Sequence, residues 1–277
     1  MRLREALRRG TEFLQRGGLA PEEARRETRL ILAHLSGLRP LEIYLYPEKE
    51  IPEERFESLL RERISGRPLA YLLGEVEFFG RSFRVPPGVF IPRPETEILV
   101  EAFLRQEIPP GRILDLGTGS GVILVSILAE RPDLTGVGID LNPLALKTAR
   151  ENALRHGVAD RCRWIRGFWL DPLAPRPCFV ALVSNPPYVA EEEWGELPPE
   201  VRDHEPPEAL FGGKNGLFYI QETLSRGWTY LLPGGKIFLE LGYNQAVRVK
   251  ALGEGLGLRI EFVRDLQGIE RIAVVSR

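Results

Sequence analysis

The sequence predicts an α/β fold, a doubly wound and mostly parallel seven-stranded sheet with an antiparallel C-terminal hairpin, preceded by a small all-helical domain. From residue 112 onward, short apolar runs alternate with helical stretches, which is typical of strand–helix–strand units. Two β-type runs near the C-terminus are close enough to pair as a hairpin. The first part of the chain shows only helical periodicity, so it forms a domain of another kind.

Three helices are expected at the N-terminus, in "LREALRRGTEFLQ", "PEEARRETRLILAHLSG" and "PEERFESLLRERISG". Pro21 favours the start of the second helix, and Gly37 favours its end. The apolar positions at helical spacing are Leu3, Leu7, Phe13 and Leu14 in the first helix, and Phe56, Leu59, Leu60 and Ile64 in the third. Residues 1–80 contain 14 acidic and 14 basic side chains, so this part has no net charge with which to bind a polyanion.

The expected domains are 1–72, helical; 73–92, a β-hairpin linker; and 93–277, the sheet domain. Two β-rich runs flank Gly80 and Arg81 in "EVEFFGRSFRV", and Pro94 begins a helix in "RPETEILVEAFL". The strands of the sheet are expected in "RILDLG", "LTGVGID", "CRWIRG", "FVALVSN", "PGGKIFLELG", "LRIEFVRD" and "RIAVVSR".

The composition argues against several classes of protein. No apolar segment is long enough to cross a membrane, and the N-terminus lacks a secretory signal, so a cytoplasmic protein is expected. Cys162 and Cys178 lack the spacing of a zinc site, and no cluster of metal ligands is visible, so no metal is expected. The net charge of −2 disfavours direct DNA binding. Chain association has no sequence signal, and a monomer is expected.

A glycine-rich loop follows the first strand of the alternating region, in "ILDLGTGSG". Its spacing differs by one position from the dinucleotide fingerprint, because Val122 stands where the third glycine would be. Asp115 beside this loop would repel a pyrophosphate and attract a cationic ligand. The candidate cofactor-binding residues here are Asp115, Gly117, Thr118, Gly119, Ser120 and Gly121.

A second acid, Asp140, ends the next strand in "GVGID". At the carboxyl edge of a doubly wound sheet, such a carboxylate accepts hydrogen bonds from both hydroxyls of a ribose. Together with Asp115 it indicates a nucleoside ligand that carries positive charge and no pyrophosphate. S-adenosylmethionine has these properties.

The tetrapeptide "NPPY", Asn185 to Tyr188, follows the fourth strand and falls at the same edge. Asn185 offers a side-chain carbonyl, and the rings of Pro186 and Pro187 hold main-chain carbonyls in a stiff segment. Two fixed acceptors can hold a planar amide or amine by its hydrogens and favour the charge it gains on attacking a methyl carbon. Tyr188 offers a flat ring for packing. We therefore expect Asn185, Pro186 and Tyr188 to act in catalysis, all four residues to bind substrate, and Asn185 to contact the cofactor as well.

These motifs, with "RISGRPLAYLLGEVEFFG", "FIPRPETEILVE" and "HEPPEALFGGKNGLFY", make the whole chain resemble the release-factor glutamine N5-methyltransferases, the PrmC/HemK family, within the class I S-adenosylmethionine-dependent methyltransferases. The resemblance implies methylation of the glutamine side chain in the Gly-Gly-Gln loop of class 1 peptide chain release factors. It also implies that the helical domain recognises the substrate protein.

The resemblance carries over further residues. An aromatic ring after the third strand contacts adenine in the family, and "GFWL" offers both Phe168 and Trp169. The resemblance also implies that Arg93, Thr96 and Glu97 lie near the methionyl end of the cofactor.

Three other functions stay open at this point. A ribosomal-protein glutamine methyltransferase would share this architecture. An adenine N6 DNA methyltransferase also uses "NPPY", although it must hold its strand electrostatically, and this chain has no basic stripe. A non-catalytic module that binds S-adenosylmethionine would not need Asn185 and Tyr188.

Overall fold

The computed structural model describes residues 1–277, which divide into two compact units. The helical unit comprises Met1–Glu75 and Pro198–His204, and the sheet unit comprises Val76–Leu197 and Glu205–Arg277. The first segment of the helical unit ends at Glu75, and the domain bounds expected from the sequence stay a prediction. The sequence did not predict that Pro198–His204, far along the chain, groups with the N-terminal helices.

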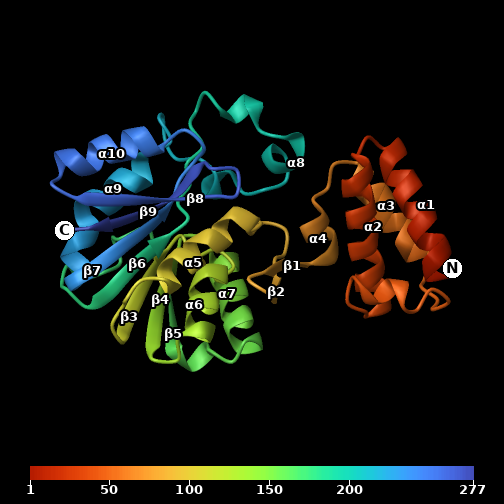
Figure 1. Ribbon diagram of the computed structural model, residues 1–277, viewed down its shortest axis with the longest axis horizontal. Helices are drawn as coiled ribbons and strands as arrows, with labels where there is room; N and C mark the ends of the chain where they lie inside the picture. The colour runs from red at the N-terminus through yellow and green to blue at the C-terminus, as the bar shows by residue number, and fades with distance from the viewer. The chain divides into compact units, whose positions relative to one another are not determined.

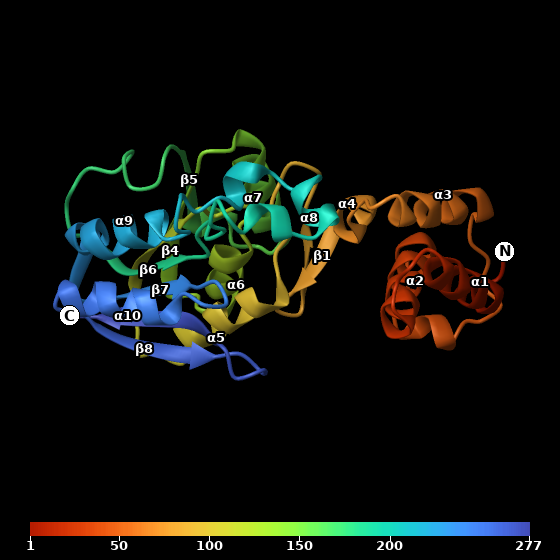
Figure 2. The same cartoon turned by 90° about the horizontal axis from the view of Figure 1, so that it is seen from above.

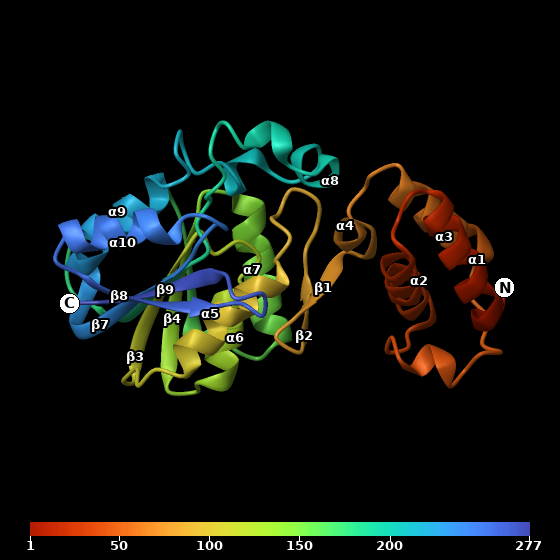
Figure 3. The ribbon, with the colours of Figure 1, turned by 45° about the horizontal axis from the view of Figure 1, so that its top comes forward.

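The helical unit is built on the three expected helices, α1 (Leu3–Arg16), α2 (Pro21–Ser36) and α3 (Glu53–Ile64), and Figure 3 shows them packed side by side. Short helical segments complete it: η1 (Glu42–Tyr44), α4 (Leu69–Leu73) and α8 (Pro199–Arg202). Most of these apolar positions are buried, whereas Phe13 is 37% exposed and Ile64 is 40% exposed. Both side chains lie near the ends of their helices.

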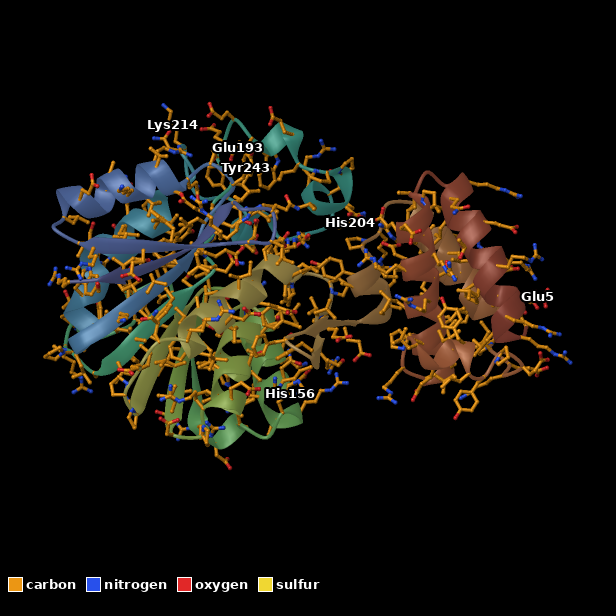
Figure 4. The ribbon with its side chains drawn as sticks, in the orientation of Figure 1. Glu5, His156, Glu193, His204, Lys214 and Tyr243 are labelled. Carbon is orange, nitrogen blue, oxygen red and sulfur yellow. The ribbon has the colours of Figure 1, made fainter.

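A buried ion pair joins two helices of the helical unit. The Nε of Arg63 on α3 lies 2.7 Å from Oε2 of Glu27 on α2, and both side chains are almost fully buried. A second nitrogen of Arg63 lies 3.0 Å from Oε2 of Glu200 on α8. Buried charges are tolerated only when they are paired, so Arg63 ties both partners to this unit. Figure 4 labels His204, the last residue of the segment attached in this way.

The sheet unit contains a seven-stranded sheet with the order β5-β4-β3-β6-β7-β9-β8, which confirms the predicted fold class. The first five strands in this order are parallel, and β9 and β8 pair antiparallel. The strands are β3 (Gly111–Leu116), β4 (Leu134–Asp140), β5 (Cys162–Arg166), β6 (Phe179–Ser184), β7 (Leu231–Glu240), β8 (Arg259–Arg264) and β9 (Glu270–Ser276).

Helices cover both faces of this sheet (Figure 1). One face packs against α5 (Glu97–Leu104), α6 (Val122–Glu130) and α7 (Pro143–Arg155), and the other against α9 (Phe218–Arg226) and α10 (Ala246–Gly255), as Figure 2 shows from above. Alternate strand residues therefore enter different apolar clusters, with Ile113 in the first and Leu114 in the second. None of the helices combines the length and the hydropathy that a bilayer span requires.

The predicted β-hairpin is present as β1 (Glu75–Phe78) and β2 (Arg81–Arg84). Its two-residue turn has positive φ at both positions, +50° at Phe79 and +67° at Gly80, which matches a type I′ turn. The backbone N–H of Phe79 donates to the carboxylate of Glu97 at 2.9 Å, and this bond holds the unusual residue in place.

The order of the strands determines where a ligand can bind. The chain runs from β3 outward through β4 and β5, and then returns to place β6 on the other side of β3. The helices that follow β3 and β6 lie on opposite faces, which leaves a crevice at the carboxyl ends of these two strands. The glycine loop and "NPPY" follow these strands directly.

Candidate functional site

A cavity in the sheet unit opens at this switch point. Its walls come from four strand ends, with residues 117–120 after β3, 139–142 at the end of β4, 167–169 after β5, and Asn185 and Pro187 after β6. The remaining wall comes from Val89, Phe90, Pro92, Thr96, Val122, Ile123, Ala145, Pro206, Glu208, Ala209 and Tyr219. The cavity therefore brings together most of the residues that the sequence selected.

The glycine loop has the backbone that its sequence requires. Gly117, Gly119 and Gly121 have φ values of +68°, +55° and +80°, in the left-handed region that disfavours side chains. A Cβ at Gly121 would approach Ala149 to 3.0 Å, so this glycine also allows the loop to pack on α7. Gly117, Thr118, Gly119 and Ser120 line the cavity, whereas Gly121 does not.

Asp140 lines the cavity and is held by two backbone donors. Its Oδ2 accepts from the N–H of Gly119 at 2.8 Å, and its Oδ1 accepts from the N–H of Asn142 at 2.9 Å. Burial raises the pKa of Asp140, these backbone bonds lower it, and the nearby Glu208 carboxylate raises it further. Each carboxylate oxygen keeps a lone pair free for a ligand hydroxyl.

Asp115 does not line the cavity. It is fully buried beneath the glycine loop, where its Oδ2 accepts a hydrogen bond from the Thr118 hydroxyl at 2.6 Å. Its Oδ1 has no partner. Burial raises the pKa of this carboxyl to about 7, and the neighbouring charge of Asp140 adds to the rise. Direct contact between Asp115 and a ligand therefore stays a prediction, whereas support of the loop through Thr118 is visible.

The raised pKa of Asp115 makes stability depend on pH. Between pH 4 and pH 7 the unfolded chain has an ionised Asp115 and the folded chain a protonated one, so unfolding releases a proton and stability falls as pH rises. In the wild type we expect the free energy of unfolding to fall by on the order of 3 kcal/mol over this window because of Asp115, and in Asp115→Asn we expect this fall to be absent. Urea unfolding without ligand, at matched pH values for both proteins, measures it. A stability difference between variant and wild type that is the same at pH 5 and pH 7.5 would contradict this.

Asn185 projects its side-chain amide at the wall of the cavity. Its Nδ2 donates to the Oγ1 of Thr96 at 3.1 Å, and Thr96 is itself buried and lines the cavity. Because the amide nitrogen is engaged in this way, the Oδ1 of Asn185 is available as an acceptor. Pro187 lines the cavity, whereas Pro186 and Tyr188 do not.

The side chain of Tyr188 does not line the cavity and instead packs beside Gly242. A Cβ at Gly242 would lie 3.2 Å from the Cδ2 of Tyr188, and the carbonyl of Tyr188 accepts from Nε2 of the buried Gln245 at 3.2 Å. The same Nε2 donates to the carbonyl of Gly216 at 2.9 Å, and Oε1 of Gln245 accepts from the N–H of Gly242. Gln245 thus fixes the end of "NPPY", a role that the sequence did not suggest.

Both aromatic candidates line the cavity, in different ways. Trp169 is buried, has a φ of +50°, and its indole N–H donates to the Oγ1 of Thr223 at 2.9 Å. A non-glycine residue in this region of backbone space is strained, which is typical of functional positions. Phe168 is 39% exposed and packs near Tyr219, with ring centroids 6.0 Å apart. The ring that contacts adenine stays a prediction between these two.

The sequence missed Glu208 as a cavity residue. With Asp140 it makes the lining acidic, since no lysine, arginine or histidine contributes to it. Glu208 follows Glu205, whose buried carboxylate accepts from the N–H of Ile91 at 3.1 Å and pairs with the guanidinium of Arg93. These contacts attach the loop after "NPPY" to the "FIPRPETE" segment. The "PPEA" sequence gave no local signal for this.

Of the three further residues that the resemblance names, only one lies at the cavity. Glu97 binds the hairpin turn and does not line the cavity, and Arg93 pairs with Glu205, whereas Thr96 lines the cavity. The structure contains no group of three or more His, Cys, Asp or Glu that could hold a metal ion. The expected independence from metals stays a prediction.

Comparison with known proteins gives concordant results. Residues 5–74 match the model of the PrmC N-terminal domain, and residues 82–196 match that of the methyltransferase small domain. A release factor glutamine methyltransferase from Cereibacter sphaeroides is 40% identical over 98% of this chain and 97% of its own, and one from Aquifex aeolicus is 39% identical over 92% of each. Among solved structures, a methyltransferase from Pyrococcus furiosus matches 71% of this chain and 88% of its own, with a TM-score of 0.54 and 20% identity.

Proposed function

The chain belongs to the release factor glutamine methyltransferases, and from this premise we propose that it transfers a methyl group from S-adenosylmethionine to the glutamine side chain in the Gly-Gly-Gln loop of class 1 peptide chain release factors. The observation that carries the proposal is an acidic cavity with an oriented asparagine amide at its wall. The family indicates the reaction, and the geometry of the cavity supports the roles of the individual residues that follow.

The lining of the cavity fits the donor. A sulfonium and an ammonium favour the carboxylates of Asp140 and Glu208, and a cavity without basic residues disfavours a phosphate. The free lone pairs of Asp140 suit the two ribose hydroxyls, while Phe168 or Trp169 offers a ring to adenine. S-adenosylmethionine, when bound, supplies a methyl group on a positively charged sulfur that departs as a neutral thioether.

Asn185 performs the positioning that the glutamine amide needs. An amide nitrogen is a poor nucleophile, because its lone pair is delocalised into the carbonyl. The Oδ1 of Asn185 and the carbonyl of Pro186 accept its two N–H groups, and these bonds strengthen as the nitrogen gains positive charge. Pre-alignment of this kind can supply about 7–11 kcal/mol of a barrier in favourable cases. The surplus proton leaves from the new ammonium-like nitrogen to water, so no general base is required.

We also propose that the helical unit recognises the release factor, and that the enzyme acts as a monomer in the cytoplasm, where translation factors are found. The match of residues 5–74 to the PrmC N-terminal domain supports the first part. The net charge of −2 and the balanced charges of residues 1–80 disfavour a duplex DNA substrate.

A labelling experiment tests the proposed substrate. The protein is incubated with methyl-labelled S-adenosylmethionine and, separately, with unmethylated release factor, the same factor with the loop glutamine changed to alanine, ribosomal protein, and duplex DNA. We expect label only on the factor that retains its glutamine. Label that appears only on ribosomal protein or only on DNA would contradict the release factor as substrate.

A further inference from the structure

Three arginines of α2, namely Arg25, Arg26 and Arg29, lie on one side of the helix. Residues three and four positions apart share a helix face, so Arg29 is a neighbour of both others. Arg25 and Arg26 are exposed and Arg29 is half-buried, whereas Ala24 and Thr28 of the same helix are buried in the core of the helical unit. The three arginines therefore form a basic stripe that faces outward.

The basic stripe lacks the acidic partners that other arginines of the helical unit have. Arg9, for example, pairs with Glu53 at 2.9 Å, and most arginines of this unit pair with a glutamate in the same way. The side chains of the basic stripe form no ion pair and no hydrogen bond. Their positive charge is therefore available to the carboxylates of a partner.

Arg29 is the most constrained member of the basic stripe. Its Nε is buried and has no hydrogen-bond acceptor, which is unfavourable for a charged group. With Arg25, Arg26 and the ring of Tyr44, the side chain lines a groove along α2. Because part of this side chain is already packed, its guanidinium can bind a carboxylate with less loss of rotamer freedom than a fully exposed arginine.

An exposed apolar segment borders the same groove. Residues 41–46 carry four large apolar side chains that are each at least 43% exposed: Leu41, Tyr44, Leu45 and Tyr46. Ile43 between them is buried in the core of the helical unit and anchors the segment, which contacts α2 through η1. Arginine and tyrosine are the residues that contribute most to binding at protein interfaces. The groove and residues 41–46 together have this composition.

The lining of the groove favours a protein partner over a nucleic acid. Glu22 and Glu23 line it beside the arginines, and their carboxylates would repel the closely spaced phosphates of a nucleic acid strand. A protein segment can instead place single carboxylates against the guanidinium groups, which bind them in a bidentate way. An apolar side chain of the same segment can pack on Tyr44 or Leu45.

We propose that the basic stripe and residues 41–46 form a docking surface for the release factor, and that they bind a segment of the factor that carries carboxylates beside an apolar side chain. This segment lies outside the Gly-Gly-Gln loop, because that loop enters the cavity of the sheet unit. The inference rests on the proposed function, since it takes the release factor as the partner. Contacts so far from the reacting amide bind substrate and transition state equally, so they lower KM and leave kcat unchanged.

Charge reversal tests the basic stripe. Arg25→Glu and Arg26→Glu are each expected to raise KM for the release factor about tenfold, and to leave kcat and the Kd for S-adenosylmethionine unchanged. Added salt should raise the wild-type KM and narrow this difference, because salt screens exposed charges. Arg16→Glu is the matched control, since Arg16 is an exposed arginine at the end of α1 that also has no ion pair and does not line the groove. It should keep the wild-type KM.

A polar substitution tests the apolar segment. Leu45 is 72% exposed, so Leu45→Ser leaves the core intact and is expected to raise KM for the release factor severalfold. Leu154→Ser is the control, because Leu154 is a 65% exposed leucine of α7 in the other unit. A short peptide around the Gly-Gly-Gln sequence lacks the docking segment, so all these variants should methylate it with the wild-type kcat/KM.

The outcomes distinguish this inference from the proposed function. If both charge reversals and Leu45→Ser methylate the whole factor with the wild-type KM, the docking surface is refuted and the proposed function stands. If the variants change the sedimentation of the protein and not this KM, the surface binds a second copy of the chain and the inference is wrong. Failure of the wild-type protein to methylate any release factor would instead refute the proposed function, and the release factor as occupant with it.

Discussion

Replacing Asn185 with alanine is expected to slow methyl transfer to release factor about 10²–10³-fold, as the loss of one oriented hydrogen bond to a developing charge does. The loss should appear in kcat as well as in kcat/KM, because the bond from the substrate amide to Oδ1 strengthens only as the nitrogen attacks. Single-turnover methylation at saturating S-adenosylmethionine measures this step without product release.

Asn244 provides the matched control for this experiment. It is an exposed asparagine of the same unit, whose Oδ1 lies 3.5 Å from an arginine nitrogen of Arg248. Asn244→Ala should react at the wild-type rate. Equal turnover by Asn185→Ala and wild type would show that another group holds the glutamine amide.

The parts of the site that follow strands were predictable, because local spacing determines them. The glycines of "GTGSG", the acid that ends "GVGID" and the amide after "FVALVS" all occupy strand ends, and parallel strands bring such ends to one edge. The three N-terminal helices were equally visible, since each repeats its apolar residues at helical spacing.

Asp115 could have been placed more accurately from the alternation of its own strand. Leu114 and Leu116 point into the apolar cluster on the α9 face, so Asp115 between them must point to the α6 face and away from the strand end. Its place beside the glycine loop in the sequence obscured this. The structure instead shows a buried carboxyl that binds Thr118.

The positions of Glu208 and Glu240 could not be predicted from the sequence, because they depend on contacts between distant segments. Glu240 in "FLELG" looks like any acid at a strand end, and only the register of β7 against β6 brings it level with Asn185. The grouping of Pro198–His204 with the helical unit includes an ion pair between Arg63 and Glu200. Contacts between residues so distant in sequence leave no local pattern.

Replacing Asp140 with asparagine is expected to weaken S-adenosylmethionine binding about 10²-fold or more. Hydrogen bonds to a charged group contribute about 1.5–3 kcal/mol each, and the carboxylate is expected to accept one from each ribose hydroxyl. The amide that replaces it has a donor on one side, and that side faces the N–H of either Gly119 or Asn142. The variant therefore loses both the charge that attracts the ligand and a bond that holds the glycine loop.

Titration calorimetry with S-adenosylmethionine and with S-adenosylhomocysteine separates these two losses. The homocysteine product lacks the sulfonium charge but keeps the ribose, so a ribose contact at Asp140 predicts similar weakening for both ligands. Asp133→Asn is the control, because Asp133 forms a partly exposed pair with Arg131, 2.6 Å apart, and does not line the cavity. If the variant binds only S-adenosylmethionine more weakly, and binds S-adenosylhomocysteine as the wild type does, Asp140 acts through charge alone. Other groups of the cavity must then hold the ribose hydroxyls.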